Sequence, residues 1–148
     1  MDFEQALKLV MALCIRFEGV YLRPYLCPAG VPTIGCGSTR YLDGRAVRLD
    51  DQPITYAHAM ILLQWRVLNE FMPGVMVLCR VRSERELAAI TDYAYNLGLN
   101  ALKHSTLRRR INVGRWDLVP GELRKWVYAA GKKLRGLTAR REAEIALL

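Results

Sequence analysis

Three polar side chains near the start of the chain have the types and the spacing to cut a bond with the help of water. Eight residues separate Glu18 from Cys27, and five separate Cys27 from Thr33. Cutting a glycosidic bond requires a proton donor on one side and, on the other, a group that handles water or the emerging cation. A carboxylic acid can donate the proton, while a thiol and a hydroxyl can act on water. The trio therefore predicts acid-assisted hydrolysis.

Each member of the trio has a predicted role and a structural alternative. Glu18 is the predicted general acid, because a carboxyl at a helix C-terminus opposes the helix dipole and its protonated form is favoured; a solvated surface glutamate is the alternative. Cys27 has three open roles: thiolate nucleophile, base for the attacking water, or a polar group that positions this water. An inert buried cysteine is its alternative. Thr33 is predicted to hold the water or to orient Cys27, with packing and a backbone hydrogen bond as the alternative.

The elements that must position this trio follow from periodicity and turn residues. Apolar residues at helical spacing predict a helix over 2–17 that ends at Gly19 and leaves Glu18 at its edge. Glycines and prolines between 20 and 52 predict short strands joined by tight turns. The fold class is therefore α+β, with a β-rich lobe over about 20–52.

Helical patterns dominate the remainder. One helix is predicted over 55–71, where Met72-Pro73-Gly74 breaks it. Ser83 and Glu86 form a capping box that opens the helix carrying Tyr93 to Leu97. Shorter helices are predicted over 106–112, 117–128 and 138–147. Together with the helix over 2–17 they form a larger helical lobe over about 55–148, and a substrate cleft is expected between the two lobes.

The bulk composition predicts one globular domain over 1–148. Apolar residues make up 52% and charged residues 24% of the 148 residues, the balance of an ordinary soluble domain. No stretch of about 18 apolar residues is present, so no transmembrane helix is predicted. The first residues are acidic where a signal peptide would carry a basic cluster.

The four cysteines, at positions 14, 27, 36 and 79, are predicted to be free thiols. None forms a Cys-x-x-Cys pair, which argues against a zinc site, and no metal is expected. Cys14 and Cys79 are interpreted as small apolar core residues. One further hypothesis is a disulfide from Cys27 to Cys36 or Cys14 that switches the site off until it is reduced.

The spacing of the trio resembles that of the phage-type lysozymes, or endolysins (glycoside hydrolase family 24), in which Asp or Cys stands at the second position. Further segments resemble the family in the same order along the chain: Tyr93–Gly98, Ser105–Leu107, Ile111–Gly114, Trp126 with Ala130-Gly131, and Gly136-Leu137 with Arg140-Arg141. The resemblance covers nearly the whole chain. It implies a lysozyme-like fold and hydrolysis of the β-1,4 bond between N-acetylmuramic acid and N-acetylglucosamine in peptidoglycan. No cofactor is expected.

The resemblance also implies which residues bind the sugar chain. Gly37 and Ser38 are predicted substrate contacts, because bare backbone beside the cleft lets a bulky sugar lie against it. Tyr95 and Asn96 are predicted on the helical side, with Asn96 as the amide partner of an N-acetyl group. Helical aromatics are more often core residues, and Tyr93 is expected to pack.

Other large or charged residues receive structural roles. The three tryptophans are predicted to be core residues because large apolar side chains at helical spacing usually are: Trp65, Trp116 and Trp126. Arg140 and Arg141 are predicted to be exposed on a terminal helix, although one of them could reach Glu18 and hold its carboxyl.

The net charge of +8, from 22 Lys and Arg against 14 Asp and Glu, favours polyanionic partners. We expect a monomer that is attracted electrostatically to anionic envelope polymers. A specific nucleic-acid interaction is not expected, because no recognition motif accompanies the charge. The alternatives are a cell-wall binding module that has lost its activity and, less favoured, a basic nucleic-acid-binding domain.

The resemblance further implies lysis of a bacterial host at the end of a phage infection. We expect the protein to stay in the host cytoplasm until a separate membrane-lesion protein releases it to the periplasm and the cell wall.

Overall fold

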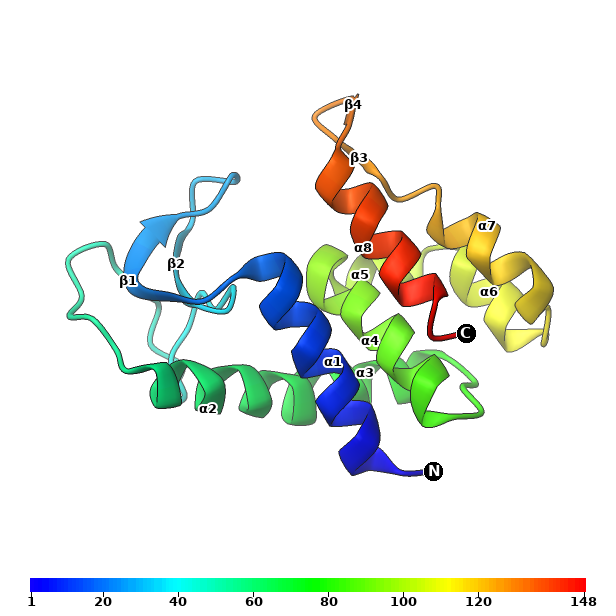
Figure 1. Cartoon of the computed structure of the whole chain (residues 1–148), viewed down its shortest axis with the longest axis horizontal. Helices are drawn as coiled ribbons and strands as arrows, with labels where there is room; N and C mark the ends of the chain where they lie inside the picture. The colour runs from blue at the N-terminus through cyan, green and yellow to red at the C-terminus, as the bar shows by residue number, and fades with distance from the viewer.

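The computed structural model describes residues 1–148 and has a small β-rich lobe beside a larger helical lobe (Figure 1). The predicted α+β class is confirmed. Helix α1 (Phe3–Glu18) runs through the middle of the molecule towards the β-rich lobe. Asp2 caps its start by accepting a hydrogen bond from the Gln5 N–H, and Gly19, at φ 71°, ends it. Glu18 therefore lies at the point where the chain passes from helix to strand.

The β-rich lobe contains one antiparallel pair, β1 (Tyr21–Leu26) and β2 (Pro32–Gly35). Tyr25 lies opposite Thr33, and the register shifts between Tyr21 and Tyr25. Two isolated antiparallel bridges, one between Ile34 and Ser38 and one between Arg40 and Ala46, add to the β structure of the lobe. Short strands with tight turns were predicted for this segment, and the structure confirms them. The lobe packs against the following helix through a small buried apolar cluster of Ile34, Val47 and Leu62.

That following helix does not end where the sequence predicts. Helix α2 (Tyr56–Arg66) continues through a π-helical turn (Val67–Phe71) into α3 (Met72–Leu78). The predicted break at Met72-Pro73-Gly74 is therefore wrong. Pro73 lies in the first turn of α3, directly after the π turn, in which the Met72 N–H donates to the Val67 carbonyl. The wide turn before it lets the chain restart a helix without interruption.

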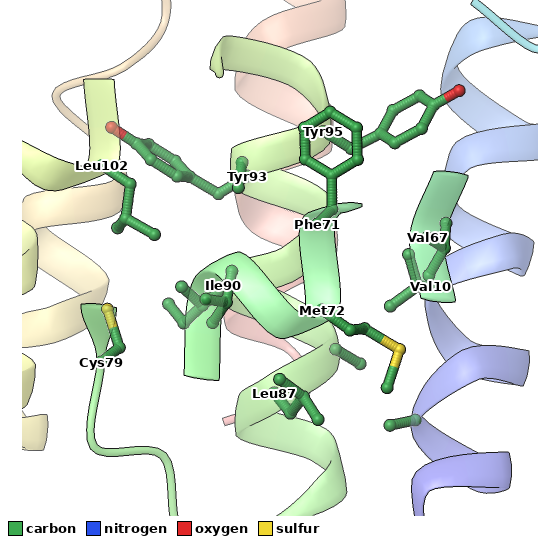
Figure 2. Close-up of a cluster of buried hydrophobic side chains, with 14 of the residues drawn as sticks. Val10, Val67, Phe71, Met72, Cys79, Leu87, Ile90, Tyr93, Tyr95 and Leu102 are labelled. Carbon is green, nitrogen blue, oxygen red and sulfur yellow. The ribbon is translucent and has the colours of Figure 1, made fainter. Parts of the chain in front are cut away.

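Helix α4 (Glu84–Leu97) forms the centre of the helical lobe (Figures 1 and 2). The Ser83 side chain accepts from the Glu86 N–H, as the capping box predicts, while the Glu86 carboxylate accepts from the Arg82 N–H. Figure 2 shows α4 side chains meeting residues of α1 and α3 in the main core. The labelled members of that core are Val10, Val67, Phe71, Met72, Cys79, Leu87, Ile90, Tyr93, Tyr95 and Leu102.

The C-terminal third is more broken than predicted. Short helices α5 (Leu99–Lys103) and α6 (Thr106–Asn112) lead to a 3-10 turn (Trp116–Leu118) and α7 (Val119–Leu123). The prediction of one helix over 117–128 is wrong, because α7 ends at Leu123. A hairpin of β3 (Tyr128–Ala129) and β4 (Lys132–Lys133) follows. Its turn places Ala130 at φ 50° and Gly131 at φ 76°, the positive values that a tight hairpin turn requires.

The last helix, α8 (Arg135–Ile145), begins three residues before the predicted start at 138 and lies beside α4 and α1. No helix of the structure combines the length and the apolar character needed to cross a membrane.

The core predictions for individual side chains are confirmed with one exception. Cys14 and Cys79 are buried, and all four cysteines are free thiols. Trp116 and Trp126 pack against the main core. Trp65 is 40% exposed, so its predicted core position is wrong: it lies on the outer face of α2.

Candidate active site

Glu18 lies in a depression of about 280 Å³ on the side of α1 that faces α4 and α8. Its lining residues are Phe17, Glu18, Asn96, Leu134, Gly136, Leu137 and Arg140. The structure thus places Glu18 and Asn96 in the lining of the same depression. A larger depression of about 720 Å³ lies among residues 41–58 and contains none of the predicted site residues.

A buried arginine holds the Glu18 carboxyl. Arg140 donates from Nη1 to Glu18 Oε1 at 2.7 Å, and from Nε and Nη2 to the two Asp92 carboxyl oxygens at 2.8 and 2.9 Å. The Glu18 side chain keeps 24% of its exposure, whereas that of Arg140 keeps 3% and that of Asp92 none. The Cys14 thiol adds a 3.6 Å contact to Asp92. An arginine fork shared by two carboxylates fixes the direction of both.

The preferred interpretation of Arg140 and Arg141 as exposed residues is therefore wrong. Both are buried, because α8 lies against α4 and the carboxylates there replace water. Arg141 donates to Asn96 Oδ1 at 2.9 Å and to Glu144 Oε1 at 2.7 Å. The carbonyl oxygen of Asn96 is thus engaged, whereas its amide nitrogen donates no hydrogen bond within the protein.

The β-rich lobe reaches the acid through Gly37. A side-chain carbon added there would lie 3.4 Å from Glu18 Oε2 and 3.6 Å from the Tyr95 ring, so only glycine leaves this contact relaxed at φ 75°. Arg66 donates to the Gly37 carbonyl at 2.9 Å and to the Tyr95 hydroxyl at 3.2 Å, and Tyr95 donates to the Cys36 carbonyl. These bonds hold the backbone at Gly37 beside the Glu18 carboxyl.

Two predicted substrate contacts do not present a free side chain. Tyr95 is 9% exposed and uses its hydroxyl to hold Cys36. Ser38 is fully buried, and its hydroxyl has no hydrogen-bond partner. In this structure both residues shape the wall behind Gly37.

The end of the β1–β2 hairpin carries Cys27 and Thr33. Both the Cys27 N–H, at 3.0 Å, and the Thr33 hydroxyl, at 2.8 Å, donate to the Val31 carbonyl. Thr33 is buried, so the backbone hydrogen bond foreseen as its structural alternative is present. Cys27 is half-buried, and backbone hydrogen bonding at Val31 lowers the pKa of its thiol.

The other thiols behave in the opposite way. Burial raises the pKa of Cys36 to about 12 and that of Cys79 to about 11, and it raises the pKa of Cys14 well above the ordinary value. Cys27 is therefore the cysteine most readily ionised, which makes it the reactive one.

Sequence reasoning missed three residues that build this site. Asp92 interrupts the apolar residues of α4, and a charge on a buried helix face was the available signal. Arg66 carried no such signal. Tyr25 lies opposite Thr33 on β1, and burial, followed by the charge of nearby Glu18, raises its pKa to about 12. Glu18 forms no hydrogen bond with Cys27 or Thr33, so the acid and the thiol are separate groups from different elements.

Comparison with known proteins agrees with this geometry. The family described as Phage lysozyme matches residues 15–144. An endolysin of Acyrthosiphon pisum secondary endosymbiont phage 1 is 32% identical over 141 residues, which cover 93% of this chain and 92% of that protein. A SAR-endolysin of Escherichia phage Mu is 30% identical over 134 residues, with coverages of 90% and 74%.

A solved structure gives the same result. The endolysin from Escherichia coli O157:H7 phage FAHEc1 superposes with a TM-score of 0.81 at 30% identity, over 99% of this chain and 92% of that one. Because the sequence match and the fold both extend over nearly the whole chain, the protein belongs to the phage lysozyme family.

Proposed function

We propose that the protein is an endolysin that hydrolyses the β-1,4 bond between N-acetylmuramic acid and N-acetylglucosamine in bacterial peptidoglycan. The observation that carries this proposal is the Glu18 carboxyl, which is anchored by a buried arginine at the edge of a depression. Glu18 protonates the leaving glycosidic oxygen as the general acid. Asn96 offers its amide nitrogen to an N-acetyl group.

Cys27 and Thr33 supply the water side of the reaction. The lowered pKa of Cys27 increases its thiolate fraction near neutral pH, and only the thiolate acts as a nucleophile or a base. This supports the base and nucleophile roles over an inert thiol. A base releases the inverted anomer and a nucleophile the retained one, so an NMR time course of the first sugar product distinguishes them.

The reaction is tested by the chemistry of the new chain ends. Purified peptidoglycan is digested and reduced with borohydride, and the fragments are analysed by mass spectrometry. We expect fragments that end in reduced N-acetylmuramic acid. Reduced N-acetylglucosamine ends, anhydro sugar ends, or cleaved peptide stems without sugar cleavage would each contradict the proposal.

The wall-binding alternative is distinguished in the same assay. A binding module without activity would sediment with peptidoglycan and release no fragments. We expect fragment release by the wild-type protein, and retained sedimentation without release by Glu18→Gln.

We also propose that the protein acts in the periplasm after passage through a membrane lesion made by a separate protein, and that its +8 charge attracts it to anionic wall polymers. Expression in Escherichia coli with and without chloroform tests the route. We expect lysis only after chloroform permeabilises the inner membrane. Lysis without permeabilisation would show that no second protein is needed.

A further inference from the structure

A second glutamate lies near the buried arginines and carboxylates that hold Glu18, and the proposed mechanism does not use it. Glu144, on α8, is fully buried. Its Oε1 accepts from Arg141 at 2.7 Å, whereas its Oε2 is buried without a hydrogen-bond partner. An ionised oxygen is unfavourable in such a place, because nothing replaces the water it has lost. The same oxygen is satisfied if it carries a proton and donates it.

The charges around Glu144 favour that proton. Three packed helices contribute the charged and titratable groups of the cluster: Cys14 and Glu18 from α1, Asp92 and Tyr93 from α4, and Arg140, Arg141 and Glu144 from α8. Three carboxyl groups thus share two guanidinium groups. With every group ionised, the cluster would hold one uncompensated negative charge, and this charge is costliest at Asp92 and Glu144, whose side chains have no exposure.

Asp92 is the neighbouring carboxyl that can accept this proton. Burial, followed by the neighbouring Asp92 carboxyl, raises the pKa of Glu144 well above its ordinary value. Both oxygens of Asp92 already receive hydrogen bonds from Arg140. Each carboxyl oxygen has two lone pairs, so Asp92 can accept one more donor.

We propose that Glu144 keeps a proton and donates it from Oε2 to Asp92, and that it is thereby a positioning residue for the acid Glu18. The proposal rests on the proposed role of Glu18. In this arrangement Glu144 donates to Asp92, and Arg140 donates both to Asp92 and, from Nη1, to Glu18. Loss of the proton would place two like charges side by side, which displaces Asp92 and with it the arginine that holds the acid.

The proton links folding to pH in a defined direction. In the unfolded chain a glutamate ionises with a pKa of about 4.3, and the folded protein, with a raised pKa at Glu144, holds the proton longer. Above the unfolded pKa the native state therefore binds more protons than the unfolded state. The free energy of unfolding falls as pH rises from there through the folded pKa.

Direct observation of the proton is the primary test. The full chain is labelled with ¹³C at the glutamate carboxyl carbons and titrated by NMR, and the Glu144 resonance is identified by its absence from Glu144→Gln. We expect the Glu144 carbon to keep the chemical shift of a protonated acid at pH 7. A carboxylate shift for that resonance at pH 7 would overturn the proposal.

Kinetics tests the positioning role. Glu144→Ala removes the donor, and we expect it to lower kcat at least tenfold with little change in KM. The amide of Glu144→Gln can donate to Asp92 and accept from Arg141, so we expect this variant to keep kcat within threefold of wild type. Glu142→Ala, two residues away on the exposed side of α8, is the matched control. Equal losses of kcat in Glu144→Gln and Glu144→Ala would contradict the proposed hydrogen bond.

The proposed function and the proposed role of Glu144 are contradicted by different results. Full activity in Glu18→Gln would refute the proposed function and leave the NMR result readable. An ionised Glu144 beside an inactive Glu18→Gln would refute the positioning role alone. If Glu144→Ala does not fold, the titration of the wild-type chain still decides.

Discussion

The two sides of the candidate site are built in opposite ways. The acid Glu18 is held by side chains from three helices, through hydrogen bonds that include a guanidinium with 3% exposure and a carboxylate with none. The thiol Cys27 stands at the end of a two-stranded hairpin, where its own N–H and the Thr33 hydroxyl donate to one backbone carbonyl, that of Val31. The acid side is therefore fixed by buried charge, and the water side by local backbone.

This contrast predicts which side tolerates change. Removing one partner of a buried charge pair leaves the other uncompensated, so the acid side should fail in stability and in activity together. A half-exposed position supported by backbone bonds accepts different side chains with little loss of stability. That is consistent with the family pattern described above, in which the position of Cys27 is occupied by Asp or Cys while the acid is Glu.

Glu18→Gln should give the largest effect on activity. The amide still accepts from Arg140 but has no acidic proton to donate, and we expect a loss of kcat of about 10²–10⁴-fold, the usual range for general acid catalysis. Release of soluble muropeptides measures it. Glu4→Gln, in the exposed first turn of the same helix, is the control and should match wild type.

Arg140→Met should give the largest effect on stability. It leaves Asp92 buried without its partner and Glu18 without its anchor, and we expect the free energy of unfolding to fall by about 3–5 kcal/mol. Urea denaturation followed by circular dichroism measures it. Arg124→Met breaks the exposed pair with Glu142 and should change nothing measurable. Similar midpoints for both variants would remove the distinction between buried and exposed charge.

Cys27→Ala tests the water side alone. We expect activity to fall about tenfold or more while the urea midpoint stays close to that of wild type, and Cys27→Asp to restore activity because a carboxylate is a permanent charge. Muropeptide release and urea denaturation are measured on the same preparations. Full activity in the alanine variant would reduce the thiol to a structural residue.

Alkylation by iodoacetamide sharpens the contrast between thiols. The lowered pKa of Cys27 means that its labelling rate rises with pH and levels off below the pH at which a free cysteine, with a pKa of about 8.5, does so. Cys14, Cys36 and Cys79 should remain unlabelled in the native protein, because burial raises their pKa values. Peptide mapping by mass spectrometry reads each site, with urea-unfolded protein as the fully labelled reference.

Gly37→Ala should give a modest loss of stability and a specific loss of activity. Alanine at positive φ costs about 1–2 kcal/mol, and its methyl group would lie in van der Waals contact with the Glu18 carboxyl, 3.4 Å from Oε2, and fill the space beside the acid. Gly44→Ala is a matched control, because Gly44 has φ 85° with no atom within 4 Å of an added carbon. We expect similar urea midpoints for the two variants and a loss of activity only in Gly37→Ala.

The sequence predicts local structure better than it predicts buried charge. Helix α1 and its end at Gly19, the short strands, and the cap at Ser83 follow from residue patterns within one turn or strand, and the structure confirms them. The pairing of Arg140 with Asp92 joins residues 48 positions apart. No periodicity reveals such a partner, so solvent exposure was the wrong default for this arginine.

Two other errors have the same origin. Pro73 breaks a regular α-helix, but a wider turn upstream removes the conflict, and Phe71 at the end of this turn packs against Tyr95 at a ring distance of 5.0 Å. Tyr128 to Lys133 form a hairpin too short for a pattern to be recognised. In both cases the local sequence permits several structures, and contacts with distant residues select one.

The π-helical turn between α2 and α3 determines how the lobes face each other. Helix α2 contacts the strands of one lobe and α3 the central helix of the other. A π turn differs from an α turn by one residue, and each α-helical residue rotates the chain by about 100°. Deleting a single residue between Val67 and Phe71 would therefore swing Phe71 away from Tyr95 and re-aim one half of the molecule against the other. The relative orientation of the two lobes thus depends on a one-residue surplus inside a helix.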